Sequence, residues 1–231
     1  MKFDPELQAA VFLRRYKRFL VDVRMPDNKE TTVYCPNTGR MTNCLRPGCD
    51  VLLSYSDNTK RKYPCTLELT RPGSCWIGVN TGRTNALVAE ALRAGIIQEF
   101  SRLKTIRPEI KVSNSSRLDF LLEDDNDMIY LEVKSCTLAA DGAAMFPDAV
   151  TKRGARHMRE LAALRSQGFK AAVLFCVQRA DADYFRPAAE IDPQYCAALR
   201  QAQGLGVMLL AYQAAVKPSG IKIIKKIPIR F

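Results

Sequence analysis

Short runs of alternating apolar and polar residues fill the first 80 positions of the chain, and turn-forming residues separate these runs. Alternation with a period of two turns one side of an extended chain toward a core, so each run predicts a β-strand. The predicted strands are Phe12–Val23, Thr31–Cys35, Asp50–Tyr55, Cys65–Leu69 and Cys75–Val79. Five short strands predict a small β-barrel over residues 1–80, of either the OB-fold or the SH3-like kind.

From residue 81 onward, helical and extended segments alternate. Apolar residues recur every three to four positions in the helices and form alternating or continuous runs in the strands. The predicted helices are Thr84–Phe100, Lys152–Arg165 and Pro193–Gln203, and the predicted strands are Glu109–Val112, Leu118–Glu123, Ile129–Ser135, Ala171–Val177 and Val207–Tyr212. This order predicts an α/β domain over residues 81–231, with a central mixed sheet between helices. A last strand, Ile221–Ile229, is compatible with either module.

Three charged residues interrupt two neighbouring apolar runs. Asp119 lies in the first run, while Glu132 and Lys134 lie in the second and leave the same face of their strand. The polar segment 123–127 predicts a hairpin that gathers the three side chains. Polar residues at such spacing often belong to a solvated face. Here both carboxylates stand within apolar runs, where an unpaired charge is costly, and this favours a functional site.

Carboxylates such as Asp119 and Glu132 are the hard oxygen ligands that Mg²⁺ and Mn²⁺ prefer. We therefore predict a Mg²⁺ or Mn²⁺ site at these two residues. Beside a scissile phosphate, Lys134 would orient the attacking water or stabilise developing charge.

The order Asp…Glu-x-Lys across a hairpin resembles the signature of the PD-(D/E)xK nuclease superfamily. The resemblance implies a phosphodiesterase site in which Asp119 and Glu132 bind metal and Lys134 acts on the nucleophile. It also implies a further metal-site glutamate from the helix before the hairpin, where Glu90 is the candidate. One position departs from the superfamily pattern, because Leu118 stands where proline is usual.

The net charge of +11 predicts a polyanionic partner. Residues 1–80 carry 13 Lys and Arg against 8 Asp and Glu, and residues 81–231 carry 22 against 16, so the surpluses are five and six. The candidate DNA contacts are Arg15, Lys17 and Arg18 in a first cluster, Lys60, Arg61, Lys62 and Tyr63 in a second, and Lys152, Arg153 and His157 in a third. Tyrosines beside the cations of the first two clusters suit stacking on unpaired bases.

Each of these clusters also has an interpretation that does not involve DNA. The first fits an alternating strand, and the second fits a solvated turn. The only histidine, His157, continues an apolar helical stripe with Leu161 and Leu164, which favours a buried, hydrogen-bonded ring over a general base. Since no helix of the major-groove-reading kind is recognisable, we predict DNA binding with little sequence preference. An RNA partner is also compatible with an OB-like module.

The cysteines and the hydropathy exclude several classes of protein. Eight cysteines form no Cys-x-x-Cys pair, and with a single histidine the chain does not predict a zinc finger. No apolar run has the length of a membrane span, and the N-terminus is too charged for a secretory signal. We therefore expect a cytoplasmic protein with reduced cysteines and no membrane partner.

Longer blocks of sequence resemble the sugar fermentation stimulation protein A family over nearly the whole chain. These blocks are Asn37–Met41, Ser56–Pro64, Val79–Thr81, Arg117–Phe120, Glu132–Leu138 and Phe146–Thr151. The resemblance implies an OB-fold followed by a nuclease-like domain, nonspecific DNA binding, and a role in regulating maltose and other sugar metabolism. Two hypotheses follow, a Mg²⁺-dependent DNA phosphodiesterase and a non-catalytic DNA-binding regulator that uses the nuclease fold as a platform. The presence of Glu90 together with Asp119, Glu132 and Lys134 favours the phosphodiesterase.

Overall fold

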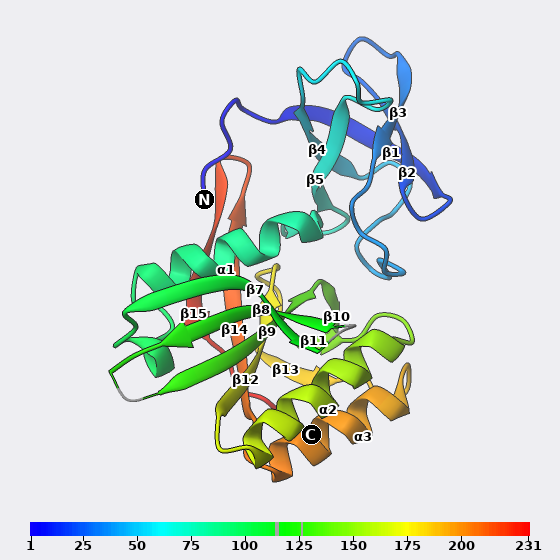
Figure 1. The fold of residues 1–231 in the computed structure, drawn as a ribbon. Coiled ribbons are helices and arrows are strands. Elements are labelled where there is room, and N and C mark those ends of the chain that lie inside the picture. The colour runs from blue at the N-terminus through cyan, green and yellow to red at the C-terminus, as the bar shows by residue number, and fades with distance from the viewer. Residues whose placement is uncertain (114–115, 126) are drawn as a thin grey trace.

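The N-terminal module is a closed barrel in the computed structural model, which describes residues 1–113, 116–125 and 127–231 (Figure 1). Its strands are β1 (Gln8–Tyr16), β2 (Leu20–Arg24), β3 (Glu30–Tyr34), β4 (Asp50–Tyr55) and β5 (Cys65–Arg71), and a short β6 (Ile77–Gly78) continues the sheet beyond β5. The strand order is β3-β2-β1-β4-β5, and a pairing between Tyr34 and Thr66 closes the barrel. This confirms the OB-fold-like barrel predicted from the alternating pattern.

One predicted strand of this module is in fact two. A turn at Lys17 and Arg18 divides the segment Phe12–Val23 into β1 and β2, and both turn residues have left-handed backbone angles, with φ values of 49° and 63°. Such turns usually carry Gly, Asn or Asp, and their absence here hid the hairpin from the pattern analysis.

The C-terminal module is built on a mixed sheet with the order β15-β14-β12-β9-β8-β7. The strands are β7 (Thr105–Ser113), β8 (Ser116–Glu123), β9 (Met128–Cys136), β12 (Lys170–Val177), β14 (Met208–Lys217) and β15 (Gly220–Lys226). The central strands β9, β12 and β14 are parallel, and the outer neighbours pair antiparallel. The hairpin between β8 and β9 forms as predicted, although Asn126 in its loop lies outside the described residues.

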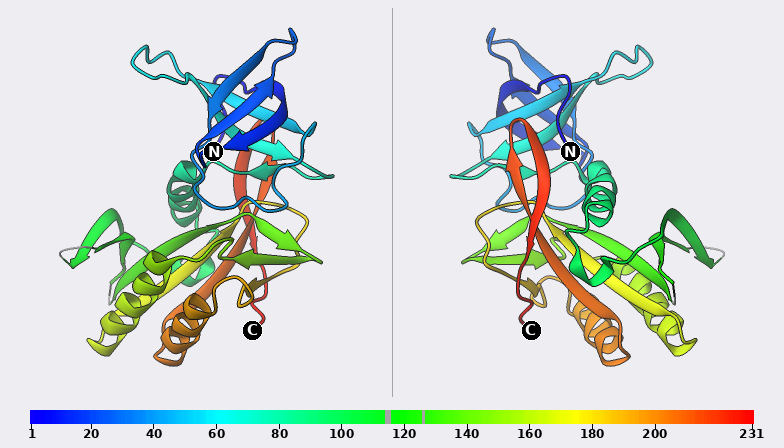
Figure 2. Two further views of the ribbon diagram at one scale, coloured as in Figure 1. Left: turned by 90° about the vertical axis from the view of Figure 1, so that its right-hand side faces the viewer. Right: turned by 90° about the vertical axis from the view of Figure 1, so that its left-hand side faces the viewer.

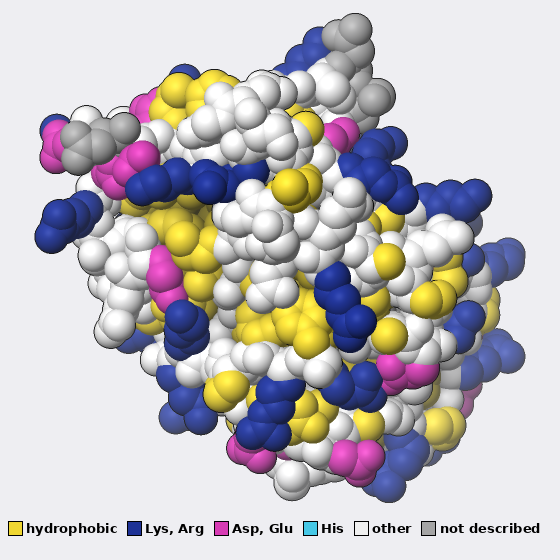
Figure 3. Space-filling model, turned by 90° about the horizontal axis from the view of Figure 1, so that it is seen from below, with side chains coloured by type: hydrophobic (Ala, Val, Ile, Leu, Met, Phe, Trp, Pro, Cys, Tyr) yellow, Lys and Arg dark blue, Asp and Glu magenta, His cyan; other side chains and the backbone are white. Residues whose placement is uncertain are grey.

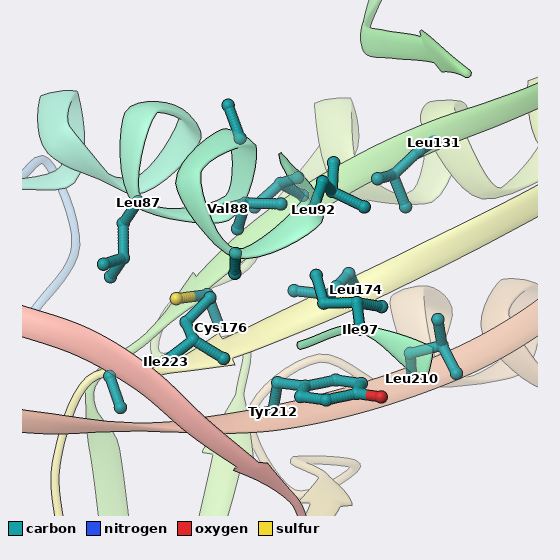
Figure 4. Packing of buried hydrophobic residues seen from close by; sticks show 14 of the residues in the cluster. Leu87, Val88, Leu92, Ile97, Leu131, Leu174, Cys176, Leu210, Tyr212 and Ile223 are labelled. Atoms are coloured by element: carbon teal, nitrogen blue, oxygen red, sulfur yellow. The ribbon is translucent and has the colours of Figure 1, made fainter. Parts of the chain in front are cut away.

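Helices cover both faces of this sheet (Figures 1 and 2). Helix α1 (Thr84–Arg93) packs on one face, while α2 (Lys152–Ser166) and α3 (Pro193–Gly204) pack on the other. The central strand β12 serves both cores, because Leu174 and Cys176 face α1 whereas Val173 and Phe175 face α2 and α3. Figure 4 shows Leu174 below the side chain of Leu92 and Cys176 below α1 on the side of Val88. Burial on both faces explains the continuous apolar run of this strand.

Three features of the C-terminal module differ from or refine the predictions. The helix predicted to reach Phe100 ends at Arg93, and Gly95 follows with a φ of 65°. A small sheet of β10 (Leu138–Ala140), β11 (Ala143–Phe146) and β13 (Tyr184–Pro187) was not predicted, because these strands have only three or four residues. The last strand, β15, pairs with β14 and not with the barrel.

None of the helices in the described part of the chain is long and apolar enough to cross a membrane.

Candidate active site

The structure brings Asp119, Glu132 and Lys134 together where β8 and β9 separate. The ladder between these strands runs from Glu123–Met128 to Phe120–Leu131 and stops there. At the next position, Asp119 Oδ2 accepts the backbone N–H of Val133 at 2.7 Å. Its Oδ1 accepts a hydrogen bond from Asn85 Nδ2 at 2.8 Å, from the first turn of α1. The carboxylate is therefore held from both sides.

Glu132 is almost fully buried, with 3% of its surface exposed. Its Oε1 accepts a hydrogen bond from Lys134 Nζ at 2.6 Å and also contacts His157 Nδ1. Arg153 Nε donates to His157 Nε2 at 3.4 Å, so the ring carries its proton on Nδ1 and donates to Glu132. Glu132 Oε2 is buried and has no hydrogen-bond partner among the described residues. A buried carboxylate oxygen without a partner is costly, and a bound cation would satisfy it.

A cavity of about 950 Å³ lies over these side chains and has walls from both modules. The C-terminal module contributes Asp119, Glu132, Lys134 and the first turn of α2, including Arg153. The barrel contributes Arg18 and the segment Asn37–Arg40, which follows β3. The site is thus recessed between the modules and is not on an open face of the sheet.

The two carboxylates have pKa values shifted in opposite directions. The pKa of Asp119 is raised, first by burial and then by the nearby charge of Glu132. The hydrogen bonds from Val133 and Asn85 lower this pKa but do not outweigh the two raising effects. Burial would also raise the pKa of Glu132, but the His157 hydrogen bond and the charge of Lys134 outweigh it and lower that pKa. The charge of Glu132 disfavours ionisation of Asp119, and a cation bound between the two carboxylates would relieve that repulsion.

The donor set fits a hard, oxygen-preferring cation. The described residues include no cluster of three or more His, Cys, Asp or Glu side chains able to hold a metal. Mg²⁺, however, commonly binds through one or two carboxylates and keeps several waters. Asp119 and the unpartnered oxygen of Glu132 meet that requirement, and the Val133 carbonyl is available on the same strand.

Glu90 is not part of this site, contrary to the prediction. Its carboxylate is exposed and pairs with the N-terminal ammonium of Met1 at 2.7 Å. Glu90 lies five positions after Asn85, which turns the two side chains about 140° apart around α1. Asn85 points to Asp119, so Glu90 points elsewhere. An asparagine in the first turn of a helix offers a weak sequence signal, and pattern analysis missed it.

Arg15 supports the cavity wall. Its guanidinium donates to the backbone carbonyls of Arg18, Asn37, Gly39 and Arg40 at distances of 2.7–3.2 Å. These bonds fix the turn after β1 to the segment after β3. Arg15 was predicted to contact DNA, but its guanidinium N–H groups donate to backbone carbonyls within the barrel.

The other predicted DNA contacts are spread over the molecule. Arg18 and Arg153 line the cavity, whereas Lys17 lines a neighbouring groove. Lys152 is exposed at the start of α2, and His157 is buried against Glu132. Lys60 and Lys62 are exposed and Tyr63 is half-buried in the loop after β4, which does not line the cavity. In the same loop, Arg61 donates to Thr66 Oγ1 at 2.8 Å.

Basic side chains also occur away from the cavity. Figure 3 shows Lys and Arg side chains scattered as separate groups over the lower face of the C-terminal module. A dispersed positive charge attracts a polyanion from many directions and carries no sequence information.

A contact between the modules was also missed by the sequence analysis. Asp148 Oδ2 accepts the backbone N–H of Met41 at 3.0 Å. A Cβ atom at Gly39 would lie only 2.7 Å from Cγ of Asp148, so a side chain there would require the Asp148 carboxylate to move. Gly39 and Asp148 both lie in sequence blocks that carry the family resemblance, but nothing in the sequence pairs the two blocks.

Comparisons with known proteins agree with this architecture. Residues 82–220 match the family model described as sugar fermentation stimulation protein RE domain, and residues 13–79 match the SfsA N-terminal OB domain. A sugar fermentation stimulation protein homolog of Desulfotalea psychrophila is 50% identical over 97% of this chain and 95% of its own length. A homolog of the same description from Geotalea uraniireducens is 45% identical over 100% of both chains.

A solved structure is similar over the whole chain. It is described as the structure of Pyrococcus furiosus SfsA in complex with Ca²⁺. The two chains superpose with a TM-score of 0.91 at 26% sequence identity, covering 100% of this chain and 98% of the other.

Proposed function

Because the chain belongs to the sugar fermentation stimulation protein family, we propose that it binds DNA and hydrolyses its phosphodiester bonds in the cavity between the modules, with bound Mg²⁺ or Mn²⁺. The observation that carries the proposal is the meeting of Asp119, Glu132 and Lys134 in one recessed cavity, with an unpartnered oxygen on Glu132. The family match to an RE domain supports the same function.

Asp119, Glu132 and the Val133 carbonyl are the groups that would hold the cation. A bound Mg²⁺ or Mn²⁺ supplies positive charge that polarises a phosphate oxygen and makes a water more acidic. The Pyrococcus furiosus relative is described in complex with Ca²⁺, which shares the preference of Mg²⁺ for oxygen ligands. That likeness supports the binding of a divalent cation by this chain.

His157 and Lys134 have complementary tasks in this proposal. His157 engages Oε1 of Glu132 and so leaves Oε2 for the cavity. Lys134 is held by the same Oε1 atom at 2.6 Å and lines the cavity with its ammonium group. A cation in this position orients the attacking water and stabilises the negative charge that develops on the phosphate.

DNA affinity would come from cations on both modules. Arg18, Arg40 and Arg153 line the cavity and offer phosphate contacts. Lys60 and Lys62, which are exposed in the loop after β4 and away from the cavity, would add further phosphate contacts. Phosphate contacts give affinity without reading bases, so the proposed binding has little sequence preference. Through such binding the protein would influence sugar metabolism, in keeping with the names of its relatives.

Cleavage assays on purified protein test the proposal. Supercoiled plasmid, linear duplex, single-stranded and flapped DNA are incubated with Mg²⁺, with Mn²⁺ or with EDTA. We expect nicking of at least one substrate with a divalent cation, no nicking in EDTA, and loss of nicking in Asp119→Asn. Asp50→Asn is the matched control, because Asp50 is exposed on the barrel and pairs with Arg71. No cleavage of any substrate, or equal cleavage by Asp119→Asn, would leave only the non-catalytic DNA-binding regulator.

A further inference from the structure

A segment of the barrel covers the recessed site. The loop between β3 and β4 is tied to the C-terminal module by three contacts. Met41 N–H donates to Asp148 at 3.0 Å, Asn43 Nδ2 donates to the Ala139 carbonyl at 3.3 Å, and Cys44 Sγ lies 3.4 Å from the Thr137 carbonyl. Beneath it, Glu132 and Lys134 are only 3% and 9% exposed. A nucleic-acid backbone must therefore bend into the cavity to reach these two side chains.

A second hollow lies beside this cavity. It has a volume of about 590 Å³ and runs along β1. Arg15, Arg18 and Arg40 line both hollows, so these arginines lie between the two. The outer hollow also has Tyr16 and Lys17 on its walls. Cations therefore line both the hollow along β1 and the cavity over the site.

The turn between β1 and β2 carries an exposed aromatic residue next to cations that line the two hollows. Phe19 follows Lys17 and Arg18, and its ring is 43% exposed. Its carbonyl accepts the Cys35 N–H at 2.7 Å, which fixes the turn to β3. In the described part of the chain, the side chains of Lys17, Arg18 and Arg40 have no hydrogen-bonded or ion-paired partner. A rigid turn thus places a free ring beside free cations.

We propose that the substrate is single-stranded DNA, which passes over this turn and along β1 into the cavity. Phe19 stacks on an unpaired base, and Arg18 and Arg40 contact phosphates between that base and the scissile bond. An exposed ring beside a cationic groove suits a single strand, because every unpaired base offers a face for stacking. A duplex offers no such face and is too stiff to bend within a few base pairs. This inference rests on the proposed function, since it names the substrate of the same site.

Binding in EDTA tests the inference without cleavage. Full-length protein is titrated with a fluorescent 20-nucleotide oligo(dT) and with a duplex of equal length. We expect tighter binding of the single strand, and a loss of roughly 5- to 150-fold in Phe19→Ala, as one lost stacking contact predicts. Phe19→Trp should restore the affinity, and duplex binding should not respond to either change. Phe231→Ala is the matched control, because Phe231 is a 50% exposed phenylalanine at the other end of the chain.

Equal affinity for duplex and single strand, or equal losses in Phe19→Ala and Phe231→Ala, would overturn the inference. Tighter binding of oligo(U) than of oligo(dT) would overturn the assignment to DNA. These outcomes are separate from failure of the proposed function. Metal-dependent nicking of duplex without single-strand preference would refute only the inference, whereas Phe19-dependent binding of oligo(dT) without any cleavage would refute only the catalytic proposal.

Discussion

The carboxylate of Asp119 accepts the backbone N–H of Val133 at 2.7 Å, immediately beyond the last paired residues of β8 and β9. One side chain therefore has two roles. It replaces the backbone acceptor that the separating strand no longer provides, and it presents a carboxylate to the cavity. The strands part at this point, which leaves the Val133 segment accessible to a ligand.

The raised pKa of Asp119 predicts a pH dependence of stability in metal-free protein. Between the ordinary aspartate pKa and the raised value, the folded state holds a proton that the unfolded state has lost, so stability falls as the pH rises through this window. Asp119→Asn removes this titration. We expect the free energy of unfolding of wild type, minus that of Asp119→Asn, to decrease as the pH rises through the window. Urea unfolding in EDTA at a series of pH values measures the difference, and an increase with pH would contradict the prediction.

Gly39 should be intolerant of a side chain. In Gly39→Ala the added Cβ meets the Asp148 carboxylate, and we expect a loss of about 1–3 kcal/mol in the free energy of unfolding. The cost should shrink when Asp148→Ala is introduced in the same chain, because the obstructing carboxylate is then absent. Gly73→Ala is the control, since nothing lies within 4 Å of a Cβ there. Urea unfolding of Gly39→Ala, Asp148→Ala, the double variant, Gly73→Ala and wild type measures these effects, and equal costs at Gly39 and Gly73 would refute the contact.

Most of the fold could be predicted from periodicity. The run Ala171–Val177 is buried on both faces as the central strand β12, and the alternation in 1–80 corresponds to the barrel. Asp119, Glu132 and Lys134 were found because charges within buried runs are costly and need partners. Periodicity and charges within apolar runs are local patterns, so a single sequence is enough to recognise them.

Contacts between distant segments could not be predicted in this way. Glu90 was assigned to the site from its chain position, but the rotation of α1 brings Asn85 there instead. The contact of Asp148 with Met41 joins residues 107 positions apart, and no local pattern specifies it. Likewise, the turn at Arg18 uses ordinary residues in left-handed backbone angles, which only the closed barrel selects.

The loop after β4 should contribute to DNA affinity but not to cleavage. Replacing Lys60, Arg61 and Lys62 together with alanine removes up to three phosphate contacts. We expect weaker DNA binding and a slope of log affinity against log salt that is smaller by up to about 2.7 for duplex DNA. Fluorescence titrations at several salt concentrations measure the slope, and nicking at saturating DNA should be unchanged.

The control for this loop removes three exposed cations from the β14–β15 hairpin, namely Lys217, Lys222 and Lys225. If this second triple variant loses as much affinity and slope as the first, net charge alone accounts for binding. The loop would then have no special place in the DNA interface.

Lys134→Ala should separate cleavage from binding. The ammonium of Lys134 is one cation among many, so its loss removes at most one phosphate contact and changes DNA affinity only slightly. The same group lies 2.6 Å from Glu132 in the recessed cavity, where it stabilises charge that appears only in the transition state. We therefore expect metal-dependent nicking to fall by about 10²- to 10³-fold, the usual cost of losing one such donor.

Lys170→Ala is the matched control, because Lys170 also pairs with a carboxylate, that of Asp127, but at the opposite end of the neighbouring strand β12. It should cleave and bind like wild type, and both variants should show the wild-type circular dichroism spectrum. Single-turnover nicking assays and titrations in Ca²⁺ or EDTA give the two readouts separately. Equal nicking by Lys134→Ala and wild type would show that Lys134 is not catalytic. A parallel loss of binding and nicking would instead make Lys134 a DNA contact, because transition-state stabilisation leaves ground-state affinity intact.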